Sequence, residues 1–147
     1  MRLFLAVAAS ALCLQSSPAA AWQAGAEGRL CTLEHDEAGI SVRLTYDATG
    51  PEYTISITRA EPWPRAPVFA LTFVGARGNQ IATTRHALSA DSRTLTVADT
   101  GFGNVLDGLA RNAMAIAQTG EANVPIDLTG ARPEVEAFRT CGAAPAV

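Results

Sequence analysis

The stretch "ISVRLTYDATGPEYTISITR", residues 40–59, decides the fold class because apolar and polar side chains alternate along two short runs. In each run every second residue is bulky and apolar, as Ile40 and Val42 illustrate, and polar residues stand between. This period of two is typical of strands with one buried and one solvated face. The intervening "DATGP" contains Asp, Gly and Pro, which favour a turn. The stretch therefore predicts an antiparallel hairpin of residues 40–47 and 52–59.

Similar short runs continue on both sides of this hairpin, separated by segments rich in turn residues. They predict six further strands at residues 28–35, 68–74, 80–85, 94–98, 113–118 and 123–128. Helical spacing of apolar residues predicts two short helices near residues 102–109 and 132–141. The expected fold is a β-dominated α+β domain. It has an antiparallel sheet or sandwich of about eight short strands, with both helices in the C-terminal third.

Local signals predict how the two helices begin and end. Asp99 or Thr100 is available as the N-cap of the first helix, and Asp107 and Arg111 stand four residues apart on it. Gly142 is expected to end the second helix.

The glycines before the first helix raise the question of a nucleotide site. A strand, then Gly101-Phe-Gly103, then a helix is also how a dinucleotide-binding loop begins. Leu106 stands where that motif needs a small residue, and no βαβ unit surrounds it. The pattern therefore predicts a helix start, and Gly108 is expected to allow close packing of this helix on the sheet.

The first 21 residues, "MRLFLAVAASALCLQSSPAAA", resemble a secretory signal peptide. A basic residue is followed by a short apolar run and an Ala-x-Ala ending, and the run is too short to span a bilayer. We expect cleavage after Ala21, a single mature domain over residues 22–147, and a periplasmic or secreted location with no transmembrane segment after cleavage. An uncut N-terminal membrane anchor is the alternative.

Two cysteines, Cys31 and Cys141, remain once Cys13 leaves with the signal peptide. An even count in an exported chain predicts a disulfide, and only one pairing is possible. The alternative is a pair of free thiols for redox or metal chemistry, but their spacing is not C-x-x-C.

The charge pattern argues against a polyanionic partner. All 11 cationic residues are arginines, against 14 acidic residues and a net charge of −3. The charges are interspersed, whereas nucleic-acid binding draws on clustered Lys and Arg. Without any lysine, the chain has no Walker A loop. We expect no nucleic acid among its partners and assign no cofactor.

The segment "RAEPWPRAP", residues 59–67, is the most distinctive candidate binding site. Its three prolines make it stiff, and Trp63 stands between Glu61 and Arg65. One interpretation is a preorganised recognition loop with an aromatic anchor. The other is a rigid crossover whose tryptophan caps the core, and this is the one that we favour.

Two histidines, His35 and His86, are the candidates for chemistry. His35 lies in "EHDE", residues 34–37, which is either a weak metal site or, as we favour, a solvated hairpin turn. Two lone histidines without H-x-x-x-H or a similar spacing are a poor zinc site, and no metal ligand is assigned. A periplasmic hydrolase that uses His35 or His86 remains an alternative because triads assemble in space. No G-x-S-x-G motif is present, and no catalytic residue is assigned.

Three stretches, "TRAEPWP" (58–64), "GFGNVLDGL" (101–109) and "IDLTGARPEVEAFRTC" (126–141), together with the signal peptide, carry a resemblance. They resemble a group of short exported alphaproteobacterial proteins whose members often carry the name of the helicase component of excinuclease ABC. This chain does not support that name, because it lacks the Walker A lysine and a helicase-sized core. The ending in Phe-x-x-Cys is also similar to the invasion-associated locus B family. That likeness implies a β-rich envelope protein and supplies no site residues.

These observations lead to one main hypothesis and two alternatives. The main hypothesis is a small exported envelope protein, a non-catalytic module that binds a protein or another envelope component. The alternatives are the hydrolase described above and a purely structural envelope protein. The oligomeric state and the identity of a partner are not predicted.

Overall fold

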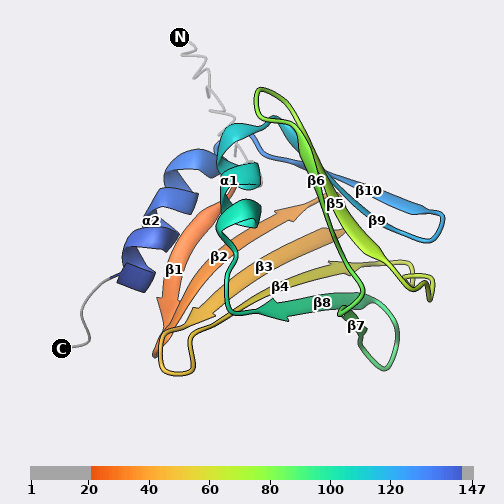
Figure 1. Cartoon of the computed structure of the whole chain (residues 1–147), viewed down its shortest axis with the longest axis horizontal. Coiled ribbons are helices and arrows are strands. Elements are labelled where there is room, and N and C mark those ends of the chain that lie inside the picture. The colour runs from red at the N-terminus through yellow and green to blue at the C-terminus, as the bar shows by residue number, and fades with distance from the viewer. Residues whose placement is uncertain (1–20, 144–147) are drawn as a thin grey trace, which may run out of the picture.

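The structure is a computed structural model that describes residues 21–143. Within these residues, ten strands form two antiparallel sheets, and two helices lie in the C-terminal third (Figure 1). The β-dominated α+β fold is confirmed. The elements are β1 (Gln23–Glu27), β2 (Leu30–Glu37), β3 (Ile40–Asp47), β4 (Glu52–Arg59), β5 (Phe69–Val74), β6 (Asn79–Thr83), β7 (Ala87–Leu88), β8 (Thr94–Asp99), α1 (Gly103–Arg111), β9 (Met114–Thr119), β10 (Ala122–Asp127) and α2 (Ala131–Ala143).

The first sheet has six strands in the order β1-β2-β3-β4-β8-β7. Strands β3 and β4 have the predicted bounds, and their register places Leu44 opposite Ile55, both buried. Strand β2 extends to Glu37, past its predicted end. It does so because the turn to β3 consists only of Ala38 and Gly39, whose φ values of 30° and 79° are typical of a tight type I′ turn.

The second sheet has four strands in the order β10-β9-β5-β6 and packs over the inner face of the first. The chain passes between the sheets after β4, β6 and α1, so strands from distant parts of the sequence become neighbours. The inner faces of both sheets and one face of each helix form a single hydrophobic core. Its most deeply buried members include Leu33, Leu44, Ile57, Leu95, Ile126, Val135 and Phe138.

Helix α2 lies along β1 and β2, and α1 lies between α2 and β6 (Figure 1). The predicted disulfide is present: Cys31 in β2 is bonded to Cys141 in α2, across a sequence separation of 110 residues. The bridge fixes the last turns of α2 to the first sheet.

The predicted N-cap of α1 is wrong. Helix α1 begins at Gly103, its N-cap residue is Phe102, and no side chain caps it. Asp99 lies at the end of β8, where its carboxylate accepts a hydrogen bond from the backbone N–H of Thr100 at 2.7 Å. The buried ring of Phe102 holds the helix start against the core, so packing takes the place of a polar cap.

Two further local predictions for the helices are also wrong. Asp107 does not pair with Arg111 on its own helix but accepts a hydrogen bond from Arg139 of α2 at 2.6 Å. Helix α2 continues through Gly142 to Ala143. In both cases a neighbouring element decides the outcome: Arg139 comes from the other helix, and α2 is fixed to β2 by the disulfide.

Gly108 has the expected role. A Cβ atom at this position would overlap the ring of Phe73 in β5, so the glycine lets α1 approach the second sheet closely. Strands β1 and β7 were not predicted. The sequence of β1, "QAGAE", has only small apolar residues and lies at a sheet edge with most side chains exposed. Strand β7 has only two residues.

The proposed signal peptide lies, apart from Ala21, outside the described residues. Within residues 21–143, neither helix has the length and apolar character that crossing a bilayer requires.

Candidate functional site: an inter-sheet pocket and a buried histidine network

The proline-rich segment between β4 and β5 does not present its tryptophan at the surface. Only 2% of Trp63 is exposed, and its indole N–H donates a hydrogen bond to the carbonyl oxygen of Ile57 at 3.1 Å. The guanidinium carbon of Arg59 lies 4.8 Å from the ring centroid and covers the ring. Glu61 and Arg65 are exposed on either side. Trp63 therefore caps the core, and its ring cannot serve as an exposed aromatic anchor.

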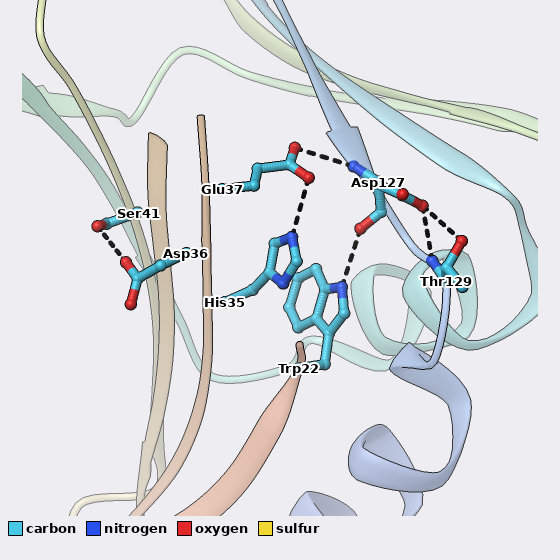
Figure 2. A network of polar contacts seen from close by, with 7 residues as sticks. All are labelled: Trp22, His35, Asp36, Glu37, Ser41, Asp127 and Thr129. Carbon is cyan, nitrogen blue, oxygen red and sulfur yellow. Dashed lines mark hydrogen bonds and ion pairs between the residues drawn. The ribbon is translucent and has the colours of Figure 1, made fainter. Parts of the chain in front are cut away.

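His35 lies in a strand rather than in a solvated turn, so that interpretation of "EHDE" is wrong. Alternation along β2 places His35 and Glu37 on the inner face of the sheet, while Asp36 points outward and contacts Ser41 (Figure 2). Only 4% of His35 is exposed. Its ring stacks on Trp22 with 4.6 Å between centroids, and its Nε2 lies 3.1 Å from Glu37 Oε2.

The carboxylate of Glu37 connects His35 to the other sheet. Its second oxygen accepts a hydrogen bond from the backbone N–H of Asp127 at 3.1 Å. The Trp22 indole N–H donates to the carbonyl oxygen of the same residue at 2.9 Å (Figure 2). The backbone N–H and hydroxyl of Thr129 donate to the Asp127 carboxylate, and these bonds lower the pKa of Asp127. The Trp22 network, Trp22 with His35, Glu37, Asp127 and Thr129, thus joins the segment before β1 and the end of β2 to the end of β10.

The two histidines are not assembled for nucleophilic catalysis. In residues 21–143, the hydrogen bond of His35 is to Glu37, and the Nδ1 atoms of both histidines are buried without a partner. A serine nucleophile would need a hydroxyl within hydrogen-bond reach of a histidine. His86 lies on a different segment, between β6 and β7, where it shares a shallow surface pocket with Arg65. In the described part of the chain, no group of three or more His, Cys, Asp or Glu residues is placed to hold a metal ion.

A pocket opens between the two sheets, where β6 and β8 lie near their edges. Its volume is about 220 Å³. The apolar lining comes from four strands and from α1 and includes Ile55, Phe69, Leu71, Ile81, Val97 and Val105. Ile81 and Val97 are only half-buried, because the short strand β7 leaves the end of β8 without a neighbour on that side. An apolar pocket with a few polar groups at its opening is the usual form of a small-molecule site.

The opening of this pocket carries an ion pair. Arg85, in the segment after β6, donates from Nη2 to Asp99 Oδ2 at 2.9 Å. Asp99 lies at the end of β8, so the pair connects the edges of the two sheets across the opening. Thr83 and Asn104 complete the polar part of the lining. The pocket thus has an apolar interior and a charged edge.

Sequence reasoning missed the pocket. Ile55, Ile81 and Val97 were predicted to lie on strands, but nothing in their spacing shows that two sheet edges stay apart at this point. The one usable signal was indirect: a two-residue strand between turn-rich segments cannot cover the neighbouring edge.

The fold and the pocket define a disulfide-bridged β-sandwich with an apolar cavity between its sheets. No protein-family model, curated protein or solved structure matches this chain. The resemblances seen in the sequence therefore remain expectations.

Proposed function

We propose that this protein is an exported, non-catalytic binding module that holds the apolar part of a small molecule in the inter-sheet pocket. The observation that carries the proposal is the apolar lining of a cavity of about 220 Å³ that opens at the surface. For comparison, an engineered apolar cavity of about 150 Å³ is large enough to bind benzene. The pocket therefore suits one aromatic ring or a short aliphatic chain.

The exported location is supported by the covalent chemistry. The Cys31–Cys141 disulfide is of the kind that persists in oxidising compartments. The leader-like residues 1–21 agree with such a compartment, the periplasm or the exterior of the cell. In that setting the binding module would meet envelope components and small amphipathic molecules.

A titration with octan-1-ol, followed by NMR of the ¹⁵N-labelled disulfide-bonded protein, tests the proposal. We expect shifts at the amides of Ile81 and Val97. The variant Val97→Trp places a large side chain in the pocket and should weaken binding at least about tenfold, which corresponds to about 1.4 kcal/mol.

Val74→Trp is the matched control. Val74 ends β5, is 49% exposed and does not line the pocket. Its replacement should leave octan-1-ol binding unchanged, and thermal unfolding should show that both variants are folded. The proposal fails if octan-1-ol shifts no pocket amide of the wild-type protein, or if Val97→Trp binds as the wild type does.

A further inference from the structure

The opening of the pocket offers more hydrogen-bond donors than acceptors. A guanidinium has five N–H donors. In the described residues the Arg85 side chain makes one hydrogen bond, from Nη2 to Asp99, so most of its donors are unused. Asp99, by contrast, accepts at both oxygens, from Arg85 at Oδ2 and from the Thr100 backbone at Oδ1. The unused capacity is therefore that of a cationic donor.

We infer that the ligand of this pocket is a small monocarboxylate with an apolar tail, and that Arg85 binds its carboxylate. This inference rests on the proposed function and adds the charge of the ligand to it. The apolar tail lies between the sheets against Ile81 and Val97, and the carboxylate remains at the opening. A guanidinium forms two parallel hydrogen bonds with a carboxylate, which fixes both the position and the orientation of the ligand.

Arg85 is the partner that can move. Its side chain is 72% exposed, whereas that of Asp99 is 38% exposed and is held by the Thr100 backbone. An ion pair at such exposure contributes little to stability, so exchanging Asp99 for a ligand carboxylate costs little. Asp99 also limits the charge of the ligand, because a second negative charge beside it would be repelled. A monoanion therefore suits the site better than a phosphate dianion.

Three ligands with the same tail test the inference: octanoate, octan-1-ol and octylamine, titrated by NMR into the disulfide-bonded protein. We expect the wild type to bind octanoate about five- to tenfold more tightly than octan-1-ol. Arg85→Gln should abolish this preference and leave octan-1-ol binding unchanged. Asp99→Asn should strengthen octanoate binding, because it removes both the competing partner and the repulsion.

Arg132→Gln is the matched control. Arg132 is an exposed arginine of α2 that does not line the pocket, so this change should leave the preference for octanoate intact. A peptide with a C-terminal leucine, as the free acid and as the amide, separates the two sources of such a carboxylate. Tighter binding of the free acid than of octanoate identifies a peptide C-terminus, and the reverse order identifies a free carboxylic acid.

The outcomes separate this inference from the proposed function. If octan-1-ol binds in the pocket but octanoate is not preferred, or if Arg85→Gln keeps the preference, the carboxylate is wrong and the pocket stands. A preference for octylamine that Asp99→Asn abolishes also overturns it, in favour of a cationic ligand. If none of the three ligands binds the wild-type protein, the pocket itself is not a binding site.

Discussion

The two sides of the sandwich are held together by different means. On the side of β1, β10 and α2, a disulfide, the Trp22 network and a hydrogen bond from the Ala24 backbone N–H to Glu134 at 2.8 Å fix the two sheets and the helix. On the side of β6 and β8, the edges are connected by one exposed ion pair above an apolar pocket. The comparison teaches that a small sandwich can leave one side open when the other is fixed covalently and by buried polar contacts.

Removing the disulfide should have the largest effect on this comparison. In the chain-entropy model, the double variant Cys31→Ser with Cys141→Ser loses about 4–5 kcal/mol of unfolding free energy, because the bridge closes a loop of 110 residues. Denaturant unfolding of the variant and of the oxidised wild type measures the difference.

The same experiment has a chemical control. Both cysteines of the native protein should resist alkylation until a reductant is added. Alkylation without reductant would contradict the cross-link and, with it, the oxidising compartment.

Removing the Trp22 side chain should have the next largest effect. Trp22 is 3% exposed and stacks on His35, so Trp22→Ala should cost about 3–5 kcal/mol. Trp22→Phe keeps a ring but loses the N–H that donates to Asp127, and should cost less, with about 1 kcal/mol from that bond. Chemical unfolding of both variants gives the two values. Equal losses would mean that the ring stack contributes nothing.

Acid should weaken the fixed side through Asp127. Because its folded-state pKa is lowered, mainly by the backbone N–H of Thr129, its ionised form stabilises the fold above its usual pKa. That contribution is lost as pH falls through the folded-state value. Asp127→Asn should therefore lose less stability than the wild type between about pH 6 and about pH 3.

A matched carboxylate on the other side sharpens the acid experiment. The pKa of Asp91, in the turn before β8, is also lowered, mainly by the Ser89 hydroxyl. Asp91→Asn should flatten the acid limb in the same direction. A steeper acid limb in either variant would contradict the lowered pKa of that residue.

The smallest effect is expected at the open side. Arg85→Gln removes an ion pair with 72% and 38% exposed partners, and pairs of this kind contribute about 0.2–1 kcal/mol. The melting temperature should therefore change little, although the preference for a carboxylate is lost. A large drop in stability would show that the pair holds the two sheets together, as the disulfide does on the opposite side.

Local patterns in the sequence predict most strands correctly and fail where distant residues meet. The alternation in residues 40–47 and 52–59 set the bounds of β3 and β4 because one face of each strand is buried. The turn at "DEAG" was placed too early, since Ala38 and Gly39 alone reverse the chain and His35 stays in the strand. Asp107 was assigned a partner on its own helix, and its actual partner, Arg139, comes from the second helix.

The candidate sites show the same limit. Residue types predict that Cys31 and Cys141 pair, because no other pairing is possible. The size and apolar character of Trp63 favour a position in the core, and its burial agrees with that interpretation. The pocket, however, depends on how far apart two sheet edges lie, and no local pattern in "QIATTR" or "TLTVA" reports that distance.

The position of the disulfide also orders events during folding. Sulfur atoms 110 residues apart meet only after the meander of β1 to β4 has formed and α2 has docked on it. Oxidation is therefore a late step that records correct assembly instead of guiding it. Once closed, the bridge shortens the conformational search, so the oxidised chain should refold from denaturant faster than the reduced chain.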